Sequence, residues 1–114
     1  MTYKAFDVVV VPFPFTDSSQ TKKRPALVLS SKSHFNSEAK HSIMAMITSA
    51  KNSAWPLDVK LNALASAGLS ADSVIRMKLF TLDHRFIIRK TGVLSTQDRK
   101  SVTKSLRKAL RDIL

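Results

Sequence analysis

The chain contains no cysteine, and that absence removes several classes of protein at once. Disulfide scaffolds, thiolate metal sites and cysteine nucleophiles all require this residue. Glycine is almost as scarce, since only Gly68 and Gly92 are present. The glycine-rich loops that hold nucleotide phosphates therefore cannot be formed here. The Gly-x-Ser-x-Gly elbow of many serine hydrolases is also missing.

Long apolar runs are missing as well. The longest apolar stretch is Val8 to Val11 followed by Pro-Phe-Pro-Phe, which is far shorter than the ~18 residues needed to cross a bilayer. The N-terminus has no basic region followed by an apolar core, so it does not read as a signal peptide. The length of 114 residues fits one domain with a real core. We expect a single cytoplasmic domain over residues 1–114, with no membrane contact.

Acidic residues are few beside basic ones. Eight Asp and Glu against nineteen Lys and Arg give a formal charge of +11, and such a field attracts polyanions. Nucleic acid is the obvious partner, because each neutralised phosphate releases counterions. An acidic protein partner fits the same field, and both can hold. The three histidines, His34, His41 and His84, lack the close spacing of metal motifs, so we expect no metal and no cofactor.

The apolar pattern predicts several short strands. The valine-rich segment 7–15 suits a pleated surface, and Pro12 and Pro14 mark an edge or a bulge. Gly68 is expected to stop a helical turn over 63–69, and Thr91-Gly92 reads as a turn. Further strands are expected at 24–30, 42–49, 57–61, 73–77 and 86–89. The sequence therefore predicts a mainly β fold with helices, built on a small, strongly bent antiparallel sheet or barrel.

The C-terminal segment has the pattern of an amphipathic helix. Ser95 and Asp98 resemble a capping box, with Asp in place of the usual Glu or Gln. Apolar residues recur at helical spacing, and lysine and arginine cover the other face. The stripe consists of Val102, Leu106, Ala109, Leu110 and Ile113. The favoured interpretation is a helix that packs on a sheet and exposes its basic face to solvent. The alternative is a helix that binds in a groove of a nucleic acid.

The residues that could carry chemistry are mainly arginine, lysine and hydroxyl side chains. RNA can cut itself when its 2′-hydroxyl attacks the adjacent phosphorus and leaves a cyclic phosphate. A protein then has to hold the backbone in line and stabilise extra charge on the phosphate. An arginine fork suits the phosphate, and a hydroxyl can position the sugar. Binding modules have the same sparse inventory, so these residues alone leave both functions open.

Several blocks of this sequence follow one another along nearly the whole chain, at 8–17, 22–30, 46–49, 67–69, 73–76, 78–83, 88–90 and 92–95. Together these blocks resemble the MazF/PemK toxin family. The resemblance implies an SH3-like barrel with a C-terminal α-helix, acting as a homodimer. It also implies a metal-independent endoribonuclease that cuts single-stranded RNA at short motifs. Its expected inhibitor is a cognate antitoxin whose acidic tail occupies the RNA site.

The resemblance assigns roles to individual residues. Arg24 matches the catalytic arginine of the family, which stabilises the phosphate and protonates the leaving oxygen, and Thr48 matches its catalytic hydroxyl residue. Phe13 and Phe15 could stack on bases, although such residues are more often core. The expected RNA-binding residues are Gln20, Lys22, Lys23, Trp55, Arg76 and Lys78.

Three departures from the family pattern qualify these assignments. Phe6 stands where the family usually has glycine. Ser19 and Lys78 stand where acidic residues are common, so two candidate proton acceptors are missing and the general base is left open. A non-catalytic module on the same fold, either a nucleic-acid binder or a gyrase-directed toxin, is the alternative function.

Overall fold

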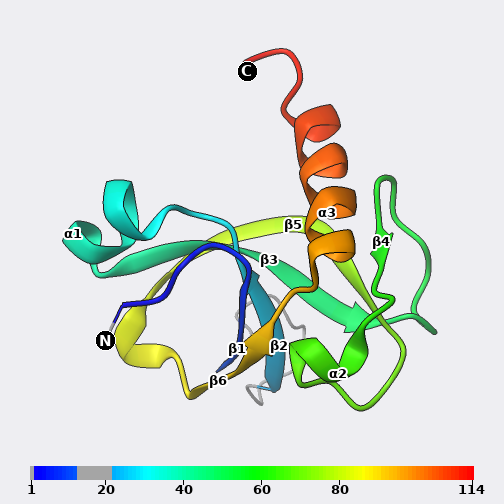
Figure 1. Cartoon of the computed structure of the whole chain (residues 1–114), viewed down its shortest axis with the longest axis horizontal. Coiled ribbons are helices and arrows are strands. Elements are labelled where there is room, and N and C mark those ends of the chain that lie inside the picture. The colour runs from blue at the N-terminus through cyan, green and yellow to red at the C-terminus, as the bar shows by residue number, and fades with distance from the viewer. Residues whose placement is uncertain (1, 13–21) are drawn as a thin grey trace.

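The computed structural model describes residues 2–12 and 22–114, and its main feature is a strongly curved antiparallel sheet (Figure 1). The sheet has six strands in the order β4-β5-β3-β2-β1-β6. Their bounds are β1 Asp7–Pro12, β2 Lys23–Val28, β3 His41–Ser49, β4 Val59–Lys60, β5 Ser73–Asp83 and β6 Arg89–Val93. The predicted mainly β fold with a terminal helix is confirmed.

Helices occupy the ends and one face of the sheet. The terminal helix α3 begins beside the sheet, and its C-terminal end projects away from the rest of the molecule (Figure 1). The others are single turns or little more. Their bounds are η1 Lys32–Asn36, α1 Ser37–Ala39, α2 Leu64–Ala67, η2 His84–Phe86 and α3 Thr96–Ala109. In the described part of the chain, no helix is long and apolar enough to cross a membrane.

The sheet buries apolar side chains on both faces, because successive residues of a strand point to opposite sides. In β1, Val8 belongs to the core beneath α3, whereas Val9 belongs to the core on the other face. The α3 side also contains Leu27, Ala45, Ile47, Ile75, Leu94 and Val102. The opposite side contains Val11, Ala26, Val28, Met44 and Phe80. A strand covered on both faces reads as a continuous apolar run, as the valines of β1 do.

Two predictions in the second half of the chain are wrong, and a third strand is longer than predicted. The strand predicted at 73–77 is present and runs on to Asp83. The strand predicted at 86–89 is replaced by the turn η2, with β6 beginning only at Arg89. Thr91 and Gly92 lie inside β6 instead of in a turn. The Thr91 hydroxyl donates to the carbonyl of Ala67 at 2.9 Å. A Cβ at Gly92 would lie 2.2 Å from the backbone oxygen of Ser66, so this glycine permits β6 to approach α2 closely.

The strands predicted at 7–15 and 57–61 are each observed over only part of their predicted length. β1 is observed over Asp7–Pro12, whereas Phe13, Phe15 and the rest of the predicted strand lie outside the described residues. The strand expected at 57–61 is present only as Val59–Lys60. Gly68 ends α2 with a φ of 73°, in the left-handed region, as predicted.

Phe6, the first departure from the family pattern, has a left-handed backbone. Its φ is 75°, a region that favours glycine and costs other residues about 1 kcal/mol or more. The backbone is fixed there because the Phe6 amide donates to Val28 at 2.7 Å and its carbonyl accepts from Leu94 at 3.0 Å. The ring packs against the core beneath α3 and lies 5.2 Å from the Arg99 guanidinium. These contacts offset the strain.

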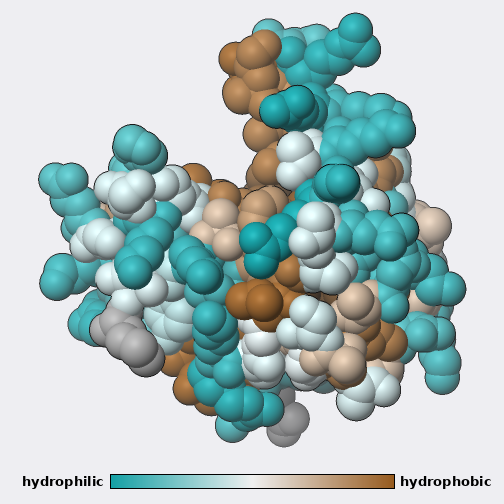
Figure 2. All heavy atoms as spheres, viewed as in Figure 1, coloured by the Kyte–Doolittle hydropathy of each residue, from teal (hydrophilic) through white to brown (hydrophobic). Residues whose placement is uncertain are grey.

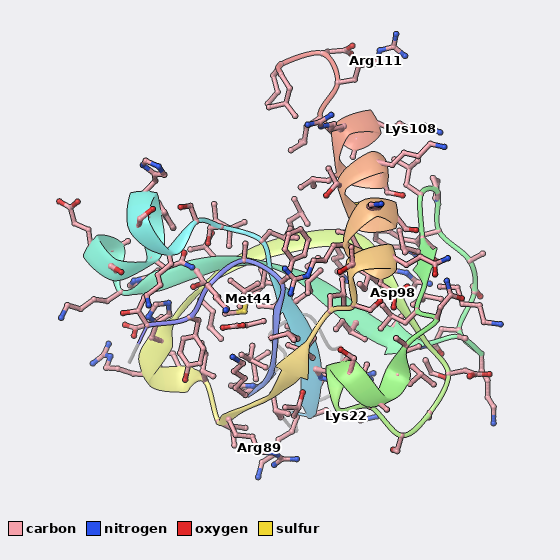
Figure 3. The ribbon with its side chains drawn as sticks, viewed as in Figure 1. Lys22, Met44, Arg89, Asp98, Lys108 and Arg111 are labelled. Atoms are coloured by element: carbon pink, nitrogen blue, oxygen red, sulfur yellow. The ribbon has the colours of Figure 1, made fainter. Side chains whose placement is uncertain are left out.

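The start of α3 is fixed by the predicted cap. The Ser95 hydroxyl accepts from the Asp98 amide at 3.2 Å. The Asp98 carboxylate is fully buried and accepts from the backbone amides of Asn62 at 3.1 Å and Ala63 at 3.0 Å. It therefore joins the base of α3 to the segment that follows β4 (Figure 3).

We expect Asp98→Ala to lower the free energy of unfolding by about 3 kcal/mol, because two buried amides lose their acceptor. Ser95→Ala removes only one cap bond and should cost about 1 kcal/mol. Urea unfolding followed by circular dichroism measures both, with the exposed Asp112→Ala as the control. An Asp98→Ala loss no larger than that of Ser95→Ala would contradict the role of Asp98 as the link between α3 and residues 62–63.

A candidate active site at the ends of β2 and β3

The two predicted catalytic side chains, Arg24 and Thr48, line the same pocket. Its volume is about 260 Å³. The other lining residues are Pro25, Ile47, Ser49, Leu69, Ser70, Ala71, Asp72 and Ser73. The pocket thus lies where β2 begins and β3 ends, beside the segment that leads into β5.

Strand register explains why residues 24 apart in sequence meet. β2 and β3 pair Leu27 with Ala45 and Ala26 with Met46, and the same register carried on by two residues sets Arg24 opposite Thr48. Residues opposite one another in an antiparallel pair share a face of the sheet. Both side chains therefore belong to the sheet face that carries Ala26, away from α3.

Arg24 presents a guanidinium with unused hydrogen-bonding capacity. The residue is half-buried, and its Nε is buried without a hydrogen-bond partner among the described residues. A buried donor without an acceptor is costly to the fold. Such a group is well suited to an anionic ligand, because guanidinium forks bind phosphate and carboxylate oxygens strongly.

Thr48 is held by a residue that the sequence did not indicate. Its side chain is 3% exposed, and its Oγ1 accepts from the Nδ2 of Asn52 at 2.6 Å. A threonine hydroxyl has one proton and two lone pairs, so this contact fills a lone pair and leaves the proton available for donation. Asn52 lies in the turn after β3. Its contact with Thr48 depends on the conformation of that turn, which the sequence does not indicate.

Arg76 is engaged in a buried ion pair. It is 7% exposed and contacts Asp58 through Nε at 3.2 Å and Nη2 at 3.0 Å. Its Nη2 also donates to the carbonyl of Ser53 at 2.6 Å. These bonds fix the loop between β3 and β4. Contact between Arg76 and RNA stays a prediction, since the donors described here face protein oxygens.

Trp55 has the exposure and surroundings expected of a stacking platform. Its side chain is 43% exposed, and its ring centroid lies 5.2 Å from the Arg76 guanidinium carbon and 5.7 Å from the Lys78 Nζ. An aromatic ring beside two cations suits a base and its phosphate. Three of the predicted RNA-binding residues are therefore brought together.

The other predicted RNA-binding residues lie near Arg24 in sequence. Lys22 and Lys23 are exposed at the start of β2, and Figure 3 shows Lys22 at the end of the molecule opposite the tip of α3. Gln20 lies outside the described residues.

A second basic surface runs along α3. A hollow of about 640 Å³ is lined by Phe6, Thr96, Arg99, Lys100, Thr103, Lys104, Arg107, Lys108 and Arg111. None of these cations forms an ion pair within the described residues. Lys108 and Arg111 lie at the projecting end of the helix, away from Lys22 (Figure 3). The predicted basic back of α3 is thus an open, uncompensated positive surface.

The histidines lie away from the pocket. His41 pairs with Asp83 at the start of β3, whereas Thr48 lies near the end of that strand. The His84 Nε2 lies 2.7 Å from the Ser42 hydroxyl, and burial lowers the pKa of this histidine. Within residues 2–12 and 22–114, no three His, Asp or Glu side chains gather as a metal site would require.

Solved structures with a similar fold include several toxins. A MazF from Deinococcus radiodurans is 24% identical, with a TM-score of 0.75 over 97% of this chain and 98% of that one. An endoribonuclease in complex with its cognate antitoxin, from a mycobacterial species, is 16% identical, with a TM-score of 0.76 over 96% and 95% of the two chains. The toxin MazF-mt6 of Mycobacterium tuberculosis is 18% identical, with a TM-score of 0.70 over 92% and 96%.

These likenesses establish a MazF-like fold. No curated protein sequence matches the chain. A family model described as PemK-like, MazF-like toxin of type II toxin–antitoxin system matches residues 4–110, which is nearly the full length. By this match the chain belongs to the PemK/MazF toxin family.

Proposed function

We propose that this chain is an endoribonuclease toxin that cuts single-stranded RNA at short motifs without a metal ion. The observation that carries the proposal is the shared pocket of Arg24 and Thr48. Membership of a toxin family and a fold shared with an endoribonuclease support it. The basic surfaces of the molecule fit a polyanionic substrate.

In the proposed reaction, the RNA supplies its own nucleophile. The 2′-oxygen attacks the adjacent phosphorus, the bond from phosphorus to the 5′-oxygen breaks, and the products carry a 2′,3′-cyclic phosphate and a 5′-hydroxyl. The Arg24 guanidinium binds the phosphate, stabilises the added charge and protonates the leaving oxygen. The Thr48 hydroxyl donates to the phosphate. Because no water has to be activated, the attack needs no metal ion, and charge stabilisation carries much of the rate.

Further residues are proposed to hold the substrate. Trp55 stacks on a base, with Lys78 and Arg76 beside its ring. Lys22 and Lys23 contact phosphates next to Arg24, and Gln20 contributes a further RNA contact. The proposed inhibitor is a cognate antitoxin with an acidic tail, which the charge of +11 would attract.

We also propose that the chain works as a homodimer in the cytoplasm. The C-terminal end of α3 projects from the sheet (Figure 1), and Leu29, Ile43, Leu79, Leu106 and Leu110 line a hollow of about 190 Å³ beside it. Ile113 is 81% exposed. Figure 2 shows apolar surface along one side of α3, facing away from its hydrophilic side. We assign this apolar side of α3 to a second copy of the chain, because an acidic antitoxin tail would bind the basic side of the helix instead.

The catalytic proposal predicts that the purified protein cuts single-stranded RNA in excess EDTA. Arg24→Ala and Thr48→Val should each lower kcat by about 100-fold or more, because each removes a donor to the transition state. The measurement is the cleavage rate of an oligonucleotide, with mass spectrometry of its ends. Arg85→Ala is the control, since that arginine is exposed on η2, beyond the end of β5 that lies away from the pocket.

A 2′-deoxy substitution at the cut position should abolish cleavage entirely. Long RNAs left intact by the wild-type protein, with Arg24→Ala behaving identically, would contradict the enzyme and favour the non-catalytic binding module.

The dimer proposal predicts that the wild-type chain scatters light as a dimer at micromolar concentration. Leu79→Lys and Ile113→Lys should each shift it towards monomer, because a charge in an apolar interface loses its hydration. Phe86→Lys is the control, since Phe86 is also exposed but lies on η2. A wild-type monomer, or equal behaviour of all three variants, would count against the proposed interface.

A further inference from the structure

Among the described residues, the lining of the pocket of Arg24 and Thr48 includes one acidic residue, Asp72. Of its ten lining residues, only Arg24 and Asp72 carry ionisable groups. Asp72 is exposed, and its carboxylate has no hydrogen-bond or ion-pair partner among the described residues. An acidic residue therefore lines the same pocket as Arg24 and Thr48.

The register of β3 with β5 fixes where Asp72 stands. Thr48 pairs with Val74 and Ser49 with Ser73, and the Ala50 amide donates to the carbonyl of Asp72 at 3.0 Å. The ladder thus continues by one residue and sets Asp72 opposite Ala50. Side chains two residues apart on a strand share a face, so Asp72 belongs to the face of Val74 and Thr48. Arg24, Thr48 and Asp72 stand on three neighbouring segments with a common face.

The proposed cleavage needs a group that accepts the proton of the 2′-hydroxyl. Ser19 and Lys78 stand where the family pattern commonly has acids, so those positions offer none. Thr48 is unsuited, because the Asn52 amide occupies one of its lone pairs and leaves the hydroxyl as a donor. Asp58 is unsuited too, because both of its oxygens contact Arg76.

We propose that Asp72 is the proton acceptor of this pocket, an inference that rests on the proposed ribonuclease function. The Asp72 carboxylate takes the proton of the 2′-hydroxyl as the 2′-oxygen bonds to phosphorus. The bond to the 5′-oxygen breaks, and this oxygen takes a proton from the Arg24 guanidinium. Asp72 then releases its proton to water, and Arg24 regains one from water. General base catalysis of this kind contributes about 100- to 10,000-fold.

The electrostatic surroundings of Asp72 favour this role. Arg24 on β2 is the other charged group that lines the pocket within the described residues. β3 supplies the neutral Thr48 and Ser49, and the segment before β5 supplies only neutral side chains besides Asp72 itself. Within the described lining, no second carboxylate therefore competes with Asp72 for the proton.

Asp72→Asn tests the proposal, because it keeps the size of the side chain and removes its basicity. We expect kcat to fall by about 100-fold or more, with KM nearly unchanged. The wild-type reaction should require a basic group at this position, so the pH profile of the residual Asp72→Asn rate should differ from that of the wild type. Asp72→Glu should restore part of the rate. Asp112→Asn, an exposed acid outside the pocket, is the matched control.

Each outcome separates this inference from the proposed function. If the wild-type chain cuts RNA and Asp72→Asn cuts equally well with the same pH profile, Asp72 is not the acceptor and the ribonuclease proposal stands. If Asp72→Asn raises KM alone, the residue is only an RNA contact, and the inference is overturned. If the wild-type chain cuts no RNA, both fall. Thermal unfolding of the variant should match the wild type, since its carboxylate holds no other group.

Discussion

The pairing of β3 with its two neighbours is the constraint on which the site depends. The central strand β3 contacts β2 on one side and β5 on the other, so a single register brings together residues from three segments. Because side chains alternate, a slip of one residue would turn Thr48 into the core beneath α3 and remove it from Arg24. The apolar residues buried on both faces of the sheet prevent such a slip. The stability of the core and the geometry of the pocket therefore have the same origin.

The sequence predicted those features that depend on local patterns. The valines of β1, the Ser95 cap and the stop at Gly68 all came from short-range signals, and the family resemblance added Arg24 and Thr48. Asn52 and Asp72 could not be found in this way, because each becomes relevant only through the turn or the strand register that sets it beside Thr48. Thr91-Gly92 was misread for a related reason. Its glycine serves a close approach to α2, a tertiary contact that a turn motif does not report.

The distribution of acids explains why so much positive charge remains on the surface. Asp98 binds backbone amides, Asp58 pairs with Arg76, Asp83 with Arg85 and Asp7 with Lys90. Half of the eight acids are thus used to hold the fold together. The cations along α3 are left facing one another at spacings of three and four residues, an arrangement that costs an isolated helix a few tenths of a kcal/mol per pair. A surface with this uncompensated positive charge suits an anionic partner.

Phe6 shows how the fold and this basic surface are coupled. A glycine would adopt its left-handed backbone without strain, but it would leave the base of α3 without a ring. The aromatic side chain packs on the core and lies beneath Arg99, whose Nε donates to the carbonyl of Leu94. Leu94, which lies between β6 and α3, is thereby linked to the turn that precedes β1. The contact between the Phe6 ring and Arg99 offsets the strain of the left-handed backbone. It also orients the first turn of α3, and with it the basic surface along the helix.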